Sequence, residues 1–323
     1  MEKDYLKIAG NIHLSYFIEA ADILGIDYEI IIPSLTAKFS YKGGRHWFIN
    51  NTVTPLTNAP SSKLARTKHF ANMILDKAGL PVPKQQKLTK EIEAIAFYGK
   101  YRDIVLKPSQ NIGGKGVSIL PRSEQEVLES FKFAQDNDKH GKVLGEEYIA
   151  GDNYRVLVVG KKVVSVIKRV PAHIIADGVN TVEQLITIEN TLRKEKLLLP
   201  IQIDTELEHK LESQNLSLSS KPEKDQEVIL RSNANMTTGG TTVEVSDTVH
   251  PYYKEICINA IIALDLEYGG VDLITPDISN PTKCAINEVN FNPGLRIHYK
   301  VEKGVPQKVA VDIMRYIMEK YSK

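Results

Sequence analysis

Cysteine is scarce in this chain of 323 residues, which contains Cys257 and Cys284 and no other cysteine. Their separation matches no metal-binding or redox motif, and both stand in apolar segments. This excludes a scaffold held together by disulfides and a zinc site built from cysteines. We expect two buried thiols in a reducing cytosol.

The chain also lacks long apolar runs and a strong net charge. The best candidate for a membrane span, residues 156–170, is interrupted by three lysines, and residues 1–4 lack the apolar core of a signal peptide. The formal net charge of +1 gives no support for bulk attraction to nucleic acid or membranes. We therefore expect a cytoplasmic protein without nucleic-acid or membrane partners.

What is present is an ordinary globular composition with alternating helix and strand signals. Apolar spacing predicts helices at residues 12–24, 61–78, 90–98, 123–135, 252–266 and 307–321. Strand-like runs lie at residues 28–32, 103–107, 142–148, 155–159 and 163–169. Residues 33–60 are expected to be rich in loops, and residues 187–226 to form a polar, helical excursion on the surface.

Two apolar runs interrupted by acid and amide groups predict a metal site. Residues 269–274 contain Asp272, residues 285–290 contain Glu288 and Asn290, and a turn-forming segment separates the runs. If the runs pair as a hairpin, the simplest register puts Asp272 opposite Glu288, and Asn290 shares the face of Glu288. Three oxygen donors then converge, which suits Mg²⁺. The alternative is two ordinary strands with polar residues facing outward.

A glycine-rich loop between two strands gives a second signal. The strand before it delivers Lys107, and the loop contains Gly113, Gly114, Lys115 and Gly116. Glycines let backbone N–H groups approach phosphate closely, and lysine adds positive charge. The spacing fits neither a P-loop nor a dinucleotide fingerprint, and a plain hairpin with a glycine-rich turn explains it equally well.

In their order along the chain, these motifs resemble those of an ATP-grasp ligase. The motifs are Lys107-Pro108, Gly114-Lys115-Gly116, Glu146-Glu147-Tyr148-Ile149, Asp272 and Glu288-Val289-Asn290. Longer segments at 169–173, 230–241, 247–251 and 292–296 resemble the ATP-grasp domain of cyanophycin synthetases and the glutathione-synthetase half of bifunctional bacterial glutathione enzymes. The resemblance covers roughly residues 60–300 and is specific for fold and reaction class, but not for substrate.

The resemblance implies an ATP-grasp fold of the α+β or α/β class, in which two α+β lobes clamp ATP beside a small N-terminal α/β unit. We expect this unit at residues 1–66. The small lid lobe with its leading helix is expected at residues 67–150, and the large lobe with the metal site at residues 151–323.

The resemblance also implies roles for single residues. Lys107 resembles the lysine that contacts the nucleotide phosphates, and residues 112–116 resemble the lid loop. The implied adenine hinge comprises Glu146, Glu147, Tyr148 and Ile149, and the implied Mg²⁺ ligands are Asp272, Glu288 and Asn290. The arginines that resemble binders of a substrate carboxylate or the transferring phosphate are Arg169, Arg231 and Arg296. Each arginine could instead form an ion pair.

Two positions depart from the family pattern. Asn72 stands where the family places a second ATP lysine, and Lys68, one helical turn earlier, is the nearest substitute. The ribose contact falls at Asn153, whose amide can still bind a hydroxyl. The sequence contains neither the large C-terminal ligase domain of cyanophycin synthetases nor the cysteine-ligating half of the glutathione enzymes, so we expect neither full activity.

The resemblance therefore implies an ATP-dependent carboxylate–amine ligase that forms an amide or peptide bond through an acyl phosphate. Its cofactors are ATP and Mg²⁺, with Mn²⁺ as the alternative ion. Its substrates are amino acids or short peptides, and a homo-oligomer is compatible with the family. A regulatory nucleotide-binding protein without turnover and a phosphotransferase stay open as alternatives. His173 and His298 are candidate acid–base groups, although a histidine beside a strand is more often structural.

Overall fold

The computed structural model describes residues 3–42, 44–109, 116–196, 198–234 and 236–321. The predicted loop residues Gly113, Gly114 and Lys115 lie outside this description. The helices are α1 Tyr5–Ala9, α2 Ile12–Leu24, α3 Ala59–Arg66, α4 Lys68–Lys77, α5 Glu91–Tyr101, α6 Glu124–Asp136, α7 Val182–Glu195, α8 Thr205–Glu212, α9 Pro251–Ala263, α10 Arg296–Tyr299 and α11 Val309–Tyr321. The strands are β1 Asp27–Ile32, β2 Thr36–Tyr41, β3 Arg45–Asn50, β4 Gln85–Leu88, β5 Ile104–Pro108, β6 Ser118–Ile119, β7 Val143–Glu147, β8 Asp152–Val159, β9 Lys162–Val170, β10 His173–Ile175, β11 Glu227–Ile229, β12 Thr241–Glu244, β13 Tyr268–Thr275 and β14 Ala285–Asn290.

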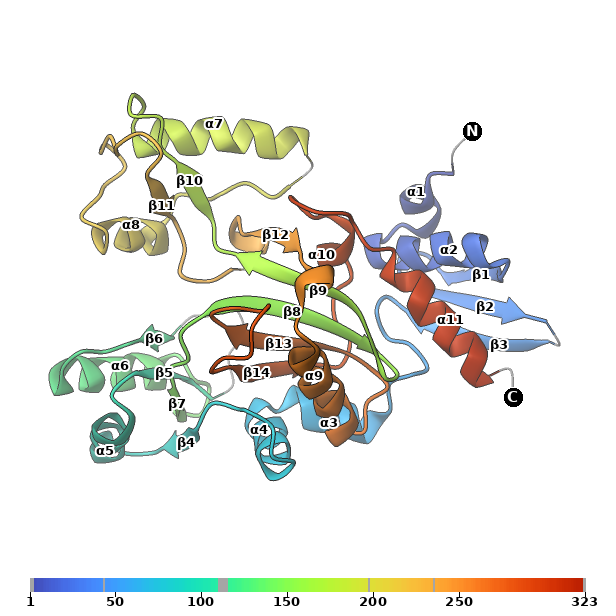
Figure 1. Cartoon of the computed structure of the whole chain (residues 1–323), viewed down its shortest axis with the longest axis horizontal. Coiled ribbons are helices and arrows are strands. Elements are labelled where there is room, and N and C mark those ends of the chain that lie inside the picture. The colour runs from blue at the N-terminus through green and yellow to red at the C-terminus, as the bar shows by residue number, and fades with distance from the viewer. Residues whose placement is uncertain (1–2, 43, 110–115, 197, 235, 322–323) are drawn as a thin grey trace.

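A five-stranded antiparallel sheet forms the centre of the molecule, with strand order β12-β9-β8-β13-β14 (Figure 1). Helices α3, α4 and α9 pack on one face and share a core with it, including Leu75, Tyr253, Val271 and Val289. An apolar sheet face must be buried against another element, and these helices fulfil that need. The opposite face is apolar where it packs against the N-terminal unit, through Leu157, Val159 and Tyr268, and carries charged side chains such as Arg155 and Asp272 elsewhere.

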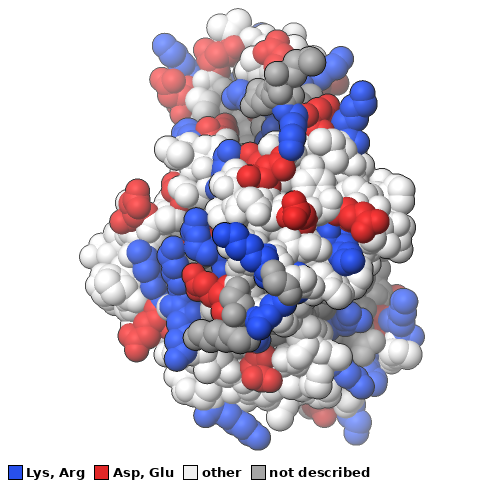
Figure 2. All heavy atoms as spheres, turned by 90° about the vertical axis from the view of Figure 1, so that its right-hand side faces the viewer, with Lys and Arg blue, Asp and Glu red and all other residues white. Residues whose placement is uncertain are grey.

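The N-terminal unit packs against one end of this sheet. Its three-stranded sheet, β1-β2-β3, shares a core with α2 and α11 that includes Phe17, Phe39, Trp47 and Ile313. The prediction of a loop-rich stretch over residues 33–60 was wrong, because β2 and β3 pair as a regular hairpin. Acidic and basic side chains are interspersed on this side of the molecule (Figure 2).

The small lobe has a sheet and a core of its own. Its strand order is β4-β7-β5-β6, and α5 and α6 bury residues such as Phe97, Leu106 and Phe131 with it. Helix α4, which leads into this lobe, packs in the core of the central sheet instead. The single helix predicted for residues 61–78 is divided at Thr67, which ends α3 and caps α4.

The predicted excursion is a compact subdomain and is wider than the sequence indicated. Strands β10 and β11 form a two-stranded sheet, and α7 and α8 complete a separate apolar core around it. In Figure 1 this subdomain projects from the central sheet beyond β9 and β12. No helix in the described part of the chain has the length and apolar character that a membrane crossing requires.

Candidate active site

The predicted hairpin register is confirmed. In the pairing of β13 with β14, Asp272 lies opposite Glu288, and Asn290 lies opposite Gly270. Val289 is buried in the core on the helix-covered face. Because side chains alternate along a strand, Glu288 and Asn290 lie on the other face, together with Asp272. The sheet therefore gathers the three predicted oxygen donors into one patch.

Two arginines hold Asp272 in this patch. Arg155 on β8 is directly opposite Asp272 and contacts both carboxylate oxygens through Nε and a terminal nitrogen. A terminal nitrogen of Arg169 lies 2.9 Å from the second oxygen. Burial opposes the charge of Asp272, but the two guanidiniums outweigh burial and lower the pKa of its carboxyl group. Asp272 is therefore ionised at neutral pH.

Gly270 makes the position of Arg155 possible. A Cβ atom at Gly270 would lie 2.8 Å from Cδ of Arg155 and 2.9 Å from Cβ of Pro293. A side chain at this position would displace the arginine from Asp272. The glycine thus lets the long arginine side chain lie over the strand.

Glu146 of the small lobe joins the two candidate phosphate lysines. Nζ of Lys107 lies 2.7 Å from one oxygen of Glu146, and Nζ of Lys68 lies 3.7 Å from the other. Gln85 donates a further short hydrogen bond to this carboxylate. The predicted substitute lysine, Lys68, therefore lies beside Lys107. Asn72 instead donates its side-chain amide to the carbonyl of Pro83.

Burial and charge act against each other in this lysine pair. Burial lowers the pKa of Lys107 to about 8 despite the neighbouring Glu146. Burial also lowers the pKa of Lys68, but Glu146 and Glu288 more than offset that effect, so its pKa is raised. Burial raises the pKa of the Glu146 carboxyl, and the two lysines reverse this and lower it. The site thus keeps two half-buried ammonium groups beside the carboxylate of Glu146.

The predicted adenine hinge connects the two lobes. The Glu147 carboxylate lies 3.0 Å from Nζ of Lys283, the Tyr148 backbone N–H donates to the Asp103 carbonyl, and Ile149 is buried. Asn153 on β8 lies opposite Arg169 on β9. The side chain of Glu146 points to the lysines, so any hinge role for this residue falls to its backbone. The roles toward a nucleotide stay predictions.

The other two predicted arginines lie in different surroundings. Arg231 is buried and donates to carboxylate oxygens of Asp204 and Glu206 and to the carbonyl of Gln202. These contacts are the ion-pair alternative that the sequence left open. Arg296 begins α10 near His13, whose pKa is lowered by burial and by this arginine. Substrate binding by Arg231 and Arg296 stays a prediction.

The two candidate acid–base histidines have structural partners. His298 is fully buried, its Nδ1 lies 2.7 Å from Oγ of Ser165, and burial lowers its pKa to about 3. Nδ1 of His173 lies 3.0 Å from the Pro171 carbonyl oxygen. Because its lowered pKa keeps His298 neutral at ordinary pH, His298 is a poor proton shuttle.

Sequence reasoning did not single out Arg155, Gln85 and Asn287 as site residues. Asn287 accepts a hydrogen bond from Nζ of Lys68 at 2.8 Å. Arg155 could have been found from the strand pattern, because it alternates with the buried residues Val156 and Tyr154 and so faces the patch. Nothing local marks Gln85 or Asn287, since their partners are distant in sequence.

Comparison with known proteins identifies relatives of the chain. The prokaryotic glutathione synthetase ATP-grasp domain matches residues 80–210. A cyanophycin synthetase of Nostoc sp. is 33% identical over 308 residues, covering 92% of this chain and 34% of that protein. A bifunctional glutathione biosynthesis protein of Listeria innocua is 34% identical over 276 residues, covering 82% of this chain and 36% of that protein. The chain thus spans about a third of the length of these curated relatives.

A solved structure extends the likeness to the whole fold. The crystal structure of a bifunctional glutathione synthetase from Pasteurella multocida aligns with 95% of this chain and 44% of that chain, with a TM-score of 0.72 and 26% identity. The two lobes and the charged groups facing each other between them define an ATP-grasp protein. The chain belongs to the ATP-grasp family, and within it is similar to cyanophycin synthetases and bifunctional glutathione synthetases, as its motifs predicted.

Proposed function

We propose that the chain is an ATP-dependent carboxylate–amine ligase that forms an amide or peptide bond and releases ADP and phosphate. The observation that carries this proposal is one juxtaposition. A patch of Asp272, Glu288 and Asn290 lies on the central sheet, and the Lys107–Glu146–Lys68 cluster joins the two lobes beside it. The names of the relatives, all synthetases or biosynthetic enzymes, support the same reaction class.

The oxygen donors of the patch fit a divalent metal. Asp272, Glu288 and Asn290 offer two carboxylates and an amide, the hard oxygen ligands that Mg²⁺ and Mn²⁺ accept. The buried side-chain nitrogen of Asn290 has no hydrogen-bond partner in the described structure. No hydrogen bond from this nitrogen therefore holds the amide in one orientation, and its oxygen can turn toward an ion. Within the described residues, no group of three His, Cys, Asp or Glu side chains forms a metal cluster. The third protein ligand in this proposal is therefore the amide oxygen of Asn290.

The proposed reaction has two steps. A substrate carboxylate attacks the γ-phosphorus of ATP, the bond to ADP breaks, and an acyl phosphate forms. A substrate amine then attacks the acyl carbon and phosphate leaves. A bound divalent cation supplies charge neutralisation at the phosphates. Lys107 and Lys68 bind phosphate oxygens, and Arg155 and Arg169 keep Asp272 ionised and oriented while stabilising nearby oxygens.

The test is phosphate release from Mg-ATP with pools of amino acids and dipeptides, followed by mass spectrometry of any active pool. Release that needs two organic partners, with a product at their summed mass minus water, supports the ligase and names its substrates. ADP formation without free phosphate would instead indicate a phosphotransferase. Nucleotide binding with no release in any pool would favour a regulatory protein.

A further inference from the structure

Asn287 is the extra residue of a β-bulge beside the carboxylate patch. In the pairing of β13 with β14, Asp272 lies opposite Glu288, but the next pair is Leu273 with Ile286, so Asn287 falls between the two pairs. A bulge of this kind turns a side chain out of the regular alternation. The bulge therefore gives β14 two consecutive residues, Asn287 and Glu288, outside the apolar core that holds Ile286 and Val289.

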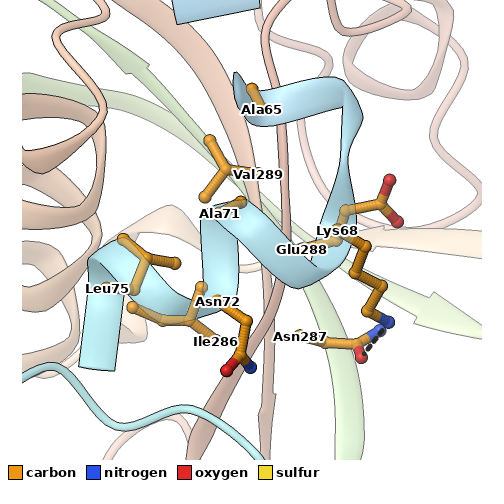
Figure 3. A pocket seen from close by; sticks show the side chains of 9 residues that line it. All are labelled: Ala65, Lys68, Ala71, Asn72, Leu75, Ile286, Asn287, Glu288 and Val289. Carbon is orange, nitrogen blue, oxygen red and sulfur yellow. Dashed lines mark hydrogen bonds between the residues drawn. The ribbon is translucent and has the colours of Figure 1, made fainter. Parts of the chain in front are cut away.

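The bulged side chain is directed at Lys68. In Figure 3, Lys68 extends from the start of α4 along β14, and its ammonium group meets the Asn287 amide at the end of the pocket. The Nζ–Oδ1 distance is 2.8 Å, whereas the nearest Glu146 oxygen is 3.7 Å away. Glu146 is closer to Lys107, at 2.7 Å. Asn287 is thus the nearer of the two groups that hold the Lys68 ammonium.

The chemistry of an amide suits this position. A lysine side chain has four rotatable bonds, and fixing it costs conformational entropy unless a partner holds it. A second carboxylate, in addition to Glu146, would hold the ammonium but also cancel its charge. The amide oxygen of Asn287 is neutral, so it orients Lys68 and leaves the positive charge to attract an anion.

We propose that Asn287 is a positioning residue that holds Lys68 beside Lys107, so that the two ammonium groups form one binding pair for the phosphates of a nucleotide. This inference rests on the proposed function, because it takes ATP as the ligand. Lys68 comes from the helix on the large sheet and Lys107 from the small lobe, so the pair joins the two halves of the site. By placing Asn287, the bulge in β14 determines the position of the Lys68 ammonium group.

The experiment is a binding titration with a fluorescent ATP analogue and Mg²⁺, which needs no organic substrate. We expect Asn287→Leu to weaken binding roughly tenfold, the scale of one hydrogen bond to a charged group. Lys68→Met should weaken it at least as much. The double variant should bind no more weakly than Lys68→Met alone, because Asn287 acts through the lysine.

Two further variants separate positioning from folding. Asn287→Asp keeps a polar side chain with a hydrogen-bond acceptor. Because its carboxylate neutralises the charge of Lys68, this variant should also weaken binding of the ATP analogue. Asn72→Leu removes an amide from the same pocket that contacts Pro83 and not the lysine, and should stay within about twofold of the unmodified chain. Thermal unfolding of each variant verifies that it is folded.

The outcomes distinguish this inference from the proposed function. If the unmodified chain binds the analogue and Asn287→Leu binds it equally well, the inference is overturned and the ligase proposal stands. If Asn287→Leu weakens binding by the same factor with and without Lys68, Asn287 does not act through the lysine, which also overturns the inference. Failure of the unmodified chain to bind the analogue would overturn both the inference about Asn287 and the proposed ligase function.

Discussion

At the residue scale, Asp272 combines a structural and a chemical role. Its carboxylate is the common partner of two largely buried guanidiniums, with side-chain exposures of 11% for Arg155 and 16% for Arg169. Removing one partner of a buried ion pair leaves uncompensated charge, which costs about 3 kcal/mol. We expect Asp272→Asn to lower the free energy of unfolding by about that amount and to abolish phosphate release.

Urea unfolding and the phosphate assay test this prediction on one preparation. The matched control is Asp277→Asn, the same change in the turn of the same hairpin, where the carboxylate accepts hydrogen bonds from Ser279 and Asn280. The control should keep its activity. Unchanged phosphate release in Asp272→Asn would refute the metal assignment.

His298 predicts a pH dependence of stability with a defined sign. Burial lowers its folded pKa to about 3, whereas the unfolded value is about 6.5. Between these values the unfolded chain binds more protons, so stability is full above about pH 6.5 and falls as the pH decreases toward 3. The slope from this one group approaches 1.4 kcal/mol per pH unit.

Urea midpoints of the unmodified chain and of His298→Leu between pH 5 and 7 measure this slope. The variant should show a shallower dependence on pH, whatever its absolute stability, because leucine does not titrate. The carboxyls of Asp272 and Glu146 have lowered pKa values and titrate below this range. Equal slopes in both proteins would show that the pKa of His298 is the same in the folded and the unfolded chain.

At the scale of elements, the helices and strands predicted correctly from the sequence are those whose pattern depends on residues close together in the chain. Apolar spacing predicted the 12–24 helix with its observed bounds, and in the structure Asn11 caps it and Gly25 ends it in the left-handed conformation. The register of the β13–β14 hairpin followed from alternation alone. Both features depend on residues that are close in sequence.

The failures at this scale have two physical causes. Strands β2 and β3 were missed although Phe39 and Trp47 face one core, because polar residues such as Lys38 and His46 interrupt the apolar pattern and a glycine pair lies between the strands. The ion-pair partners of Arg155 and Arg231 could not be identified from local patterns. Their partners are brought in by tertiary packing, which makes one arginine part of the site and places the other in a separate subdomain.

At the scale of the whole molecule, the separate cores explain how the site is assembled. The small lobe buries its own residues around Phe131, and the central sheet buries another set around Val271. Ion pairs connect the two lobes, including Lys68 with Glu146 and Lys283 with Glu147. Partly exposed ion pairs contribute little to stability. A ligand that contacts both lobes can therefore add substantially to the free energy that holds the two lobes together.

This arrangement predicts that Mg-ATP stabilises both lobes together. A ligand at 100 times its dissociation constant adds about 2.7 kcal/mol to the free energy of unfolding. We expect Mg-ATP to raise the melting temperature by several degrees, and hydrogen exchange to slow in the small lobe around Phe131 as well as in the central sheet. ATP with EDTA should stabilise less, because the lysines still bind phosphate while Asp272 and Glu288 repel it.

Calorimetry with Mg-ATP, with ATP plus EDTA and with EDTA alone measures the metal-dependent part of this shift. In Asp272→Asn, the shift with Mg-ATP should fall toward that of the EDTA sample, because the ion loses a ligand while Lys68 and Lys107 remain. A shift of equal size with and without EDTA would mean that the nucleotide binds through the lysines alone. Slower exchange confined to one lobe would mean that the nucleotide does not bridge the two lobes.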